Sequence, residues 1–253
     1  MLLLLPPSET KRDGGHGAPL DFEALAHPEL ADIRADLVDR LVALSADRDA
    51  ANRALRLGPR QAGELDRNRA LRASATMPAI DRYSGVLFDA LDSATLDAPS
   101  RTFAAEGVVV HSALFGLVGA LDPIPAYRLS HDSRIPGVRL KHHWRRPLAD
   151  RLAEHRGVII DLRSEGYTGL GPAPVRADSV FVRVVSQDSD GRRRALNHFN
   201  KQAKGRFTRA MLESRQEITS IDDLIGWAAS AGFTLDMRER SVTGAHLELE
   251  LVA

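Results

Sequence analysis

The chain of 253 residues contains no cysteine. That absence excludes a disulfide framework, a thiol nucleophile, a zinc site with cysteine ligands and an iron–sulfur cluster. Aromatic residues make up only 5% of the chain, and the 34 Lys and Arg are balanced by 34 Asp and Glu. Domains that bind polyanions usually carry a clear excess of Lys and Arg. Any contact with nucleic acid therefore depends on local charge rather than on the total.

Apolar segments long enough to cross a bilayer are also missing. The apolar start, Met1–Leu5, has no cationic residues before it and is stopped by Pro6-Pro7. It is too short for the apolar region of a signal peptide, which spans roughly 7–15 residues. We therefore expect a buried first strand here, a cytoplasmic protein and no membrane partner.

An apolar fraction of 43% is enough for one sizeable core. No linker, repeat or low-complexity tract divides the chain, so we expect a single domain over residues 1–253. Its fold class is predicted to be mixed α/β, with a mixed sheet surrounded by short helices. Three buried strands are predicted, at Leu2–Leu5, Gly107–His111 (running directly into Ser112–Val118) and Val158–Leu162. Alternating segments predict two hairpins. These pair Ser179–Ser186 with Arg192–His198 around Asp190-Gly191, and Phe233–Arg240 with Ala245–Val252.

Apolar residues at helical spacing and turn residues between them predict several helices. Their ranges are Pro28–Ser45, Asp47–Leu57, Arg60–Arg72, Arg82–Leu91, Trp144–His155, Asn200–Ser214 and Ser220–Ala229. Leu57-Gly58-Pro59 joins two of them tightly. This joint resembles half of a helix-hairpin-helix, a turn that binds phosphate backbones, although the second glycine of that motif is missing. The alternative is an ordinary helix C-cap.

Polar residues follow the first and third predicted strands directly. Loops at the carboxyl ends of strands are where α/β folds place their ligand sites. In the first loop, Ser8, Thr10 and Lys11 are candidates to meet a phosphate or carboxylate. Glu9 is a candidate base or a partner of Lys11, and the alternative is a solvated turn with a local ion pair. After the third strand, the corresponding candidates are Asp161, Ser164 and Tyr167.

A third polar region follows the second strand. Ser112 lacks the glycines of the G-x-S-x-G nucleophile elbow, which counts against a serine hydrolase. The loop Asp122–Arg128 combines an acid, two prolines, a tyrosine and an arginine, which is typical of a preorganised site and equally of a packed connector. The candidate catalytic acids are Glu9, Asp122 and Asp161. The residues expected to line a cleft are Ser8, Thr10, Tyr83, Ser112, Tyr127, Ser164 and Tyr167.

Two segments concentrate positive charge. Residues 134–156 hold seven Lys and Arg against two acids, and residues 192–209 hold seven with no acid. A charge run is usually a solvated face, but two such runs in a neutral chain predict a dipolar surface able to bind successive phosphates. The residues predicted for anion or nucleic-acid binding are Lys11, Arg128, Arg145, Arg146, Lys201, Lys204 and Arg209. No metal site or cofactor is expected, because His142 and His143 would point apart on a helix and no H-E-x-x-H motif occurs.

In this order along the chain, these segments resemble the YaaA family of peroxide-stress proteins. The resemblance spans nearly the whole chain and is carried by residues 6–11, 83–89, 112–118, 121–129, 144, 158–167 and 199–209. It implies a single-domain mixed α/β fold with a basic cleft. It also implies a cytosolic role in surviving peroxide by limiting free iron and its damage to DNA, with double-stranded DNA as a partner. The family's basic late helix falls on Lys201, Lys204 and Arg209, and its Tyr-Arg pair on Tyr127 and Arg128. The chain departs from the family at residues 8–11, with Ser-Glu-Thr-Lys in place of Ala-Lys-Thr.

The leading hypothesis is therefore a peroxide-response protein that binds duplex DNA through a basic cleft. An enzyme is the alternative, acting on a nucleotide or another anionic small molecule with acids and cations at the strand ends. A third hypothesis is a structural protein whose basic surface meets an acidic partner.

Overall fold

The apolar run that opens the chain becomes a central strand of the main sheet, β1 (Leu2–Leu5). The computed structural model describes residues 1–61, 63–187, 193–195, 199–238 and 247–252. The sheet has the strand order β4-β3-β1-β6-β7-β10-β9, and β8 pairs with β7. Five of its strands run parallel, namely β1, β3 (Val108–Ser112), β6 (Ile159–Asp161), β7 (Ser179–Gln187) and β10 (Leu247–Val252). Their carboxyl ends therefore meet at one edge.

The remaining strands of this sheet are antiparallel. β4 (Gly116–Gly119) pairs with β3, β8 (Arg193–Ala195) with β7, and β9 (Thr234–Met237) with β10. Both predicted hairpins are confirmed, although Asp190-Gly191 lies outside the described residues. The second predicted strand, Gly107–His111, is confirmed with a shift of one residue, and it ends at Ser112. The Ser112 Oγ accepts hydrogen bonds from the amides of Leu114 and Phe115 in the following turn, and the chain then reverses into β4.

Most predicted helices are confirmed with small shifts at their ends. The one predicted at Arg82–Leu91 begins only at Val86, and Arg82 is the last residue of a separate helix. The helices are α1 (Ala31–Ala46), α2 (Arg48–Leu55), α3 (Gly63–Arg69), α4 (Ala79–Arg82), α5 (Val86–Leu91), α6 (Ala98–Gly107), α7 (Leu140–Glu154), α8 (Glu165–Thr168), α9 (Phe199–Ser214) and α10 (Ile221–Ser230). Short 3-10 turns lie at Pro28–Leu30, Pro59–Gln61 and Ser93–Thr95, and β2 (Met77–Pro78) pairs with β5 (Pro123–Ile124).

The sequence analysis missed α6, which Asp97 caps by accepting from the Ser100 amide. The residue that ends α2 in a left-handed conformation is Arg56 and not Gly58.

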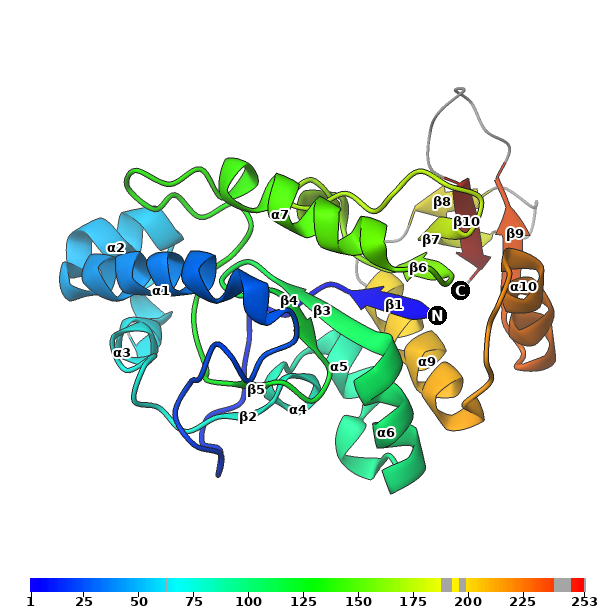
Figure 1. The fold of residues 1–253 in the computed structure, drawn as a ribbon, viewed down its shortest axis with the longest axis horizontal. Helices are drawn as coiled ribbons and strands as arrows, with labels where there is room; N and C mark the ends of the chain where they lie inside the picture. The colour runs from blue at the N-terminus through cyan, green and yellow to red at the C-terminus, as the bar shows by residue number, and fades with distance from the viewer. Residues whose placement is uncertain (62, 188–192, 196–198, 239–246, 253) are drawn as a thin grey trace.

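The sheet is covered on both faces. Figure 1 shows α7 along one face and α5, α6 and α9 on the other, with α10 beside the β9 edge. The strands contribute runs of fully buried Leu, Ile and Val to a single core that also includes residues of α1, α5 and α9. In the part of the chain that the structure describes, no helix is both long and apolar enough to cross a bilayer.

Candidate anion site at the carboxyl ends of the strands

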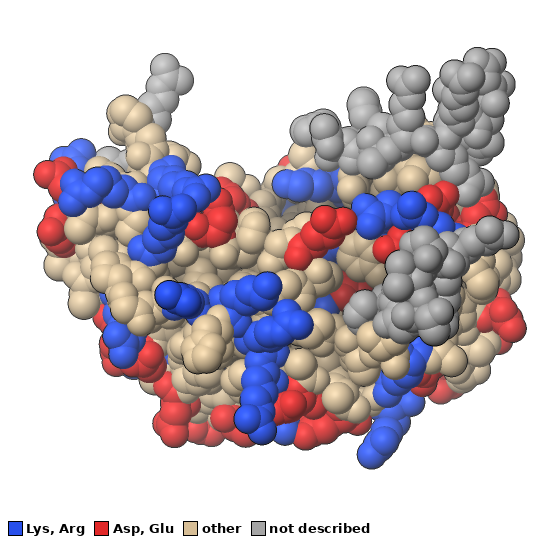
Figure 2. Space-filling model, turned by 90° about the horizontal axis from the view of Figure 1, so that it is seen from above, with Lys and Arg blue, Asp and Glu red and all other residues tan. Residues whose placement is uncertain are grey.

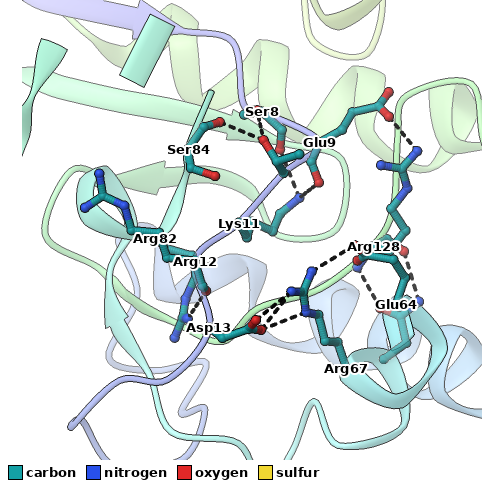
Figure 3. A network of polar contacts seen from close by, with 12 residues as sticks. Ser8, Glu9, Lys11, Arg12, Asp13, Glu64, Arg67, Arg82, Ser84 and Arg128 are labelled. Atoms are coloured by element: carbon teal, nitrogen blue, oxygen red, sulfur yellow. Dashed lines mark hydrogen bonds and ion pairs between the residues drawn. The ribbon is translucent and has the colours of Figure 1, made fainter. Parts of the chain in front are cut away.

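The loop after β1 folds back onto the segment that joins α4 to α5. Lys11 and Tyr83 form an isolated antiparallel bridge, and the Thr10 hydroxyl donates to the Ser84 carbonyl oxygen at 3.0 Å. Gly85 has a positive φ of 101° and lets the two segments approach closely, because a Cβ there would lie 3.1 Å from the Ser8 hydroxyl. These contacts turn the Lys11 side chain inward, under the loop (Figure 3).

Lys11 is only 5% exposed, although it is a lysine in a loop. Its Nζ donates to the carbonyl oxygens of Ser8 at 2.9 Å and Glu9 at 3.2 Å. It also lies 4.1 Å from the ring centroid of Tyr127 and 5.4 Å from that of Tyr83. Burial, followed by the positive charge of Arg128, lowers the pKa of Lys11 to about 7. The site therefore holds an amine that changes charge near neutral pH.

A chain of buried hydroxyl groups adjoins this amine. The Ser112 Oγ accepts from the amides of Leu114 (3.1 Å) and Phe115 (2.9 Å). Since a hydroxyl has two acceptor positions and one hydrogen, Ser112 donates to the Tyr127 hydroxyl at 2.7 Å. A second hydrogen bond of 2.8 Å joins the Tyr127 and Tyr83 hydroxyls. Burial raises the pKa of both tyrosines, so they stay protonated.

Arg128 supplies a second buried cation. Its backbone is fixed by Asn68, whose amide nitrogen donates to the Arg128 carbonyl at 3.0 Å and whose Oδ1 accepts from the Arg128 amide at 2.7 Å. Its guanidinium Nη2 lies 2.5 Å from the Glu9 carboxylate, which Figure 3 shows reaching across from the loop. Arg128 Nε is buried and has no partner among the described residues.

A buried cluster follows β6 and fixes the next part of the strand-end edge. Asp161 binds Arg163 through both carboxylate oxygens, at 2.8 and 2.6 Å. Arg163 Nη1 donates to His111 Nδ1 at 2.8 Å, so the proton of the neutral imidazole is on Nε2. Burial and the charge of Arg163 hold the pKa of His111 well below its ordinary value. The His111 ring packs edge-on against Tyr167.

An open cleft of about 590 Å³ begins at the loop after β1. It is lined by Pro6, Pro7, Ser8, Glu9, Thr10, Gly85, Val86, Leu87, Phe88 and Lys201. One wall is apolar and the other is polar, and the charged groups lining it are Glu9 and Lys201. This arrangement suits a small molecule that has both an apolar part and an anionic group.

The structure thus brings together most of the strand-end residues that the sequence analysis singled out. Ser8, Glu9, Thr10, Lys11, Tyr83, Ser112, Tyr127 and Arg128 form one connected group, with Lys201 on the cleft wall. Asp161 is engaged by Arg163, while Tyr167 lies between His111 and His131 and Ser164 is exposed ahead of α8.

Asp122 does not join this group. Its Oδ2 accepts from the amides of Ala26 at 2.7 Å and Gly119 at 2.8 Å. It therefore lies beside the start of β3, since Gly119 pairs with Val109. Burial raises the pKa of Asp122 despite these hydrogen bonds. Its contacts close a turn at the edge of the sheet opposite the strand-end site.

The basic residues of α9 have different environments. Lys201 is exposed. Lys204 is buried, with its Nζ 2.7 Å from the Leu162 carbonyl oxygen, and burial lowers its pKa to about 8. Arg209 donates to the carbonyls of Leu91 and Asp92 at 3.0 Å and pairs with Glu213. Lys204 and Arg209 therefore hold α9 in place, and Lys201 is the one of the three directed to the cleft.

Arg145 and Arg146 lie on α7, outside the strand-end group. They line a shallow groove of about 560 Å³ together with Arg139, Lys141, His142, Ala149, Asp150 and Pro172. His142 faces this groove, whereas His143 contacts the Ile33 carbonyl, so the two histidines point apart as predicted. Figure 2, seen from the side of α7, shows Lys and Arg gathered near the middle of the face with Asp and Glu close by. Within the described ranges, no three His, Asp or Glu residues are grouped as ligands of a metal ion.

The sequence analysis missed three residues that shape the site. Arg163 and His111 lie in or directly after strands that the sequence analysis predicted. An acid and an arginine two residues apart at the end of a strand, Asp161 and Arg163, could have indicated a buried ion pair. Asn68, on α3, carries no such signal, because only the packing of α3 against the loop of Arg128 gives it a role.

Fold and site together define an α/β protein with a mainly parallel sheet and a buried cationic group at the carboxyl ends of its strands. A family model described as peroxide stress protein YaaA matches residues 1–239. The chain is 42% identical over 241 residues to a UPF0246 protein of Corynebacterium glutamicum, covering 93% of this chain and 95% of the relative. It is 36% identical over 258 residues to a UPF0246 protein of Streptomyces coelicolor, covering 100% of this chain and 98% of that one. The chain belongs to the YaaA family of peroxide stress proteins.

Proposed function

We propose that this member of the YaaA family is an enzyme for a small anionic molecule, a nucleotide or another phosphorylated or carboxylated compound, bound at the carboxyl ends of β1, β3 and β6. The observation that carries the proposal is the position of Lys11. A buried amine with a pKa of about 7 lies against the rings of two tyrosines. It is near the guanidinium of Arg128, which pairs with Glu9 and has an unpartnered Nε, and near the loop that lines an open cleft.

The charges of this group of residues support the binding of an anion. Lys11 and Arg128 lie close enough for the charge of Arg128 to lower the pKa of Lys11. Holding two cations together in a buried place costs free energy unless an anion neutralises them. Glu64 and Glu9 offset part of this cost, but the pKa of Lys11 is still lowered. A bound phosphate or carboxylate would offset this repulsion and raise the pKa of Lys11. In the free protein, a neutral Lys11 can accept a proton, and Lys201 and the Tyr83 hydroxyl can orient the ligand.

Calorimetric titration with inorganic phosphate and with adenosine monophosphate tests this function. We expect binding by the wild type, and a loss of at least tenfold in affinity for Lys11→Met and for Arg128→Gln. Arg40→Gln is the control, because the Arg40 side chain on α1 is 48% exposed, paired with Asp36, and lines neither the cleft nor the groove on α7. Equal affinities in all four proteins would refute the proposal.

A second candidate function, duplex-DNA binding, is favoured by the groove on α7. Four of its lining residues are Lys or Arg and one is an acid, and Lys201 adds an exposed cation on α9. Phosphate contacts of this kind give affinity with little sequence specificity. Within a peroxide-stress role in the cytoplasm, such coating of DNA would limit damage by iron and peroxide. The affinity for a short duplex as salt is varied tests this candidate.

A further inference from the structure

The guanidinium of Arg128 is buried and only partly used. Its side chain is 11% exposed, and the Glu9 carboxylate lies closest to Nη2. The adjacent Nε is buried and without a partner among the described residues. An arginine binds a carboxylate or phosphate most strongly when Nε and Nη2 donate in parallel to two oxygens. Since Nε is unpartnered, Glu9 does not make this side-on, two-point contact.

The two partners of this ion pair differ in conformational freedom. Arg128 is held through its backbone by two hydrogen bonds with Asn68. The Glu9 side chain is 54% exposed and stands on the loop that borders the 590 Å³ cleft. Because Arg128 is fixed and Glu9 faces solvent, separation of the pair moves the glutamate and leaves the arginine in place.

The charge of the Glu9 carboxylate also acts on a second cation. It raises the pKa of Lys11, whereas burial and the charge of Arg128 lower it. An anion that replaces the Glu9 carboxylate on Arg128 thus comes within the field of both Lys11 and Arg128. The cleft that Glu9 lines also has Lys201 in its lining.

We propose that Glu9 is an internal competitor for the anion of the ligand. Its carboxylate covers Arg128 in the free protein, and the phosphate or carboxylate of a ligand entering the cleft displaces it and takes both Nε and Nη2. This inference rests on the proposed small-anion function and adds its specificity element. Neutral ligands and weakly binding anions do not displace Glu9, because displacement requires a group that binds Arg128 more strongly than the Glu9 carboxylate does.

Titration of inorganic phosphate into the wild type and four variants tests the competitor. Glu9→Gln keeps the size of the side chain and removes its charge, and we expect it to bind phosphate at least tenfold more tightly than the wild type. Glu213→Gln is the matched control, because Glu213 is 52% exposed and paired with Arg209 on α9. We expect its affinity to stay within twofold of the wild type. Arg128→Gln and the double variant Glu9→Gln/Arg128→Gln complete the set and should bind equally weakly.

The outcomes separate the two proposals. If Arg128→Gln weakens phosphate binding but Glu9→Gln gives no gain, the site exists and the competitor role is refuted. A gain from Glu9→Gln that persists without Arg128 reflects general charge removal and also refutes it. If none of the proteins, Glu9→Gln included, binds phosphate or adenosine monophosphate, the small-anion function itself fails. Thermal unfolding of each variant confirms that the folded protein was measured.

Discussion

At the scale of single residues, two completely buried arginines organise the loops around the site. Arg34 and Arg82 are both 0% exposed, and each donates to the backbone carbonyl oxygens of four residues. Those of Arg34 are Ala26, His27, Phe115 and Leu117, and those of Arg82 are Arg12, Gly14, Ala75 and Ile124. Most of these carbonyl groups lie in loops, and those of Leu117 and Ile124 belong to the short strands β4 and β5. Each arginine therefore supplies donors to backbone groups where the chain has little regular secondary structure.

Arg34→Met is therefore expected to destabilise the fold far more than a surface arginine does. It leaves two buried carbonyl oxygens, of Phe115 and Leu117, and two partly buried ones without their donors. An unsatisfied buried group costs about 1–3 kcal/mol. We expect a loss of about 3 kcal/mol or more in the free energy of unfolding, measured by urea denaturation. Arg40→Met in the same helix is the control. Its side chain is 48% exposed and paired with Asp36, so it should cost less than about 1 kcal/mol.

The depressed pKa of Lys11 predicts a pH dependence of stability. Lys11 has a pKa of about 7 in the folded protein and 10.5 as its ordinary value, because burial opposes its charge. Between these values the unfolded chain binds more protons than the folded protein, so stability rises with pH. The difference in unfolding free energy between wild type and Lys11→Met should grow in favour of the wild type from pH 7 to 10, by up to about 1.4 kcal/mol per unit. A pH-independent difference would contradict the buried amine.

At the scale of elements, the close packing of α9 on α5 depends on a glycine. A Cβ at Gly205 would overlap with the Leu87 carbonyl oxygen and lie 2.8 Å from the Ala90 Cβ. The packed helices thus need a residue that ordinary helix propensity disfavours. This contact positions α9, which carries Lys201 at the cleft.

Gly205→Ala is expected to destabilise the protein by about 1–3 kcal/mol, the usual cost of overpacking, even though alanine is the better helix former. Gly226→Ala in α10 is the matched control. Nothing lies within 4 Å of a Cβ at Gly226, so this change should stabilise by about 0.5–1 kcal/mol. Chemical denaturation of both variants checks the contrast, and equal effects would rule out the close contact.

The elements that the sequence predicted are those with strong local signals. β1, β6, α9 and α10 were found because apolar runs, helical spacing and turn residues all agree there. The late start of α5 at Val86 was not found, because it follows from the pairing of Tyr83 and Ser84 with the distant loop of Thr10 and Lys11. The sheet order likewise depends on contacts between strands far apart in the sequence.

At the scale of the whole molecule, the neutral chain distributes its charge unevenly. On α7 the groove has four Lys and Arg against Asp150, while many other arginines are paired with acids. If duplex DNA binds this face, the double variant Arg145→Glu/Arg146→Glu should lose affinity. The slope of log affinity against log salt should fall by about two, one for each lost phosphate contact.

The control for this test reverses two exposed arginines on and directly after α9, which covers the face of the sheet away from α7. This variant, Arg206→Glu/Arg215→Glu, changes the net charge equally. Its duplex affinity and salt slope should stay close to those of the wild type, as measured by fluorescence anisotropy. If both double variants behave alike, the groove has no special role. Lys201→Glu then shows whether the cleft of the strand-end site contributes.

The sequence by itself determined the class of fold, the strand-end position of the loop with Glu9 and Lys11, and the family, because these depend on local patterns and their order. The tertiary structure decided which charges are available. In the folded protein Lys204 is buried and donates to the Leu162 carbonyl oxygen, and Asp122 lies at the edge of the sheet opposite the strand-end site. Glu9 forms an ion pair with Arg128. Burial and pairing are properties of distant segments in contact, and the charge of a residue in the sequence does not reveal what covers or neutralises it.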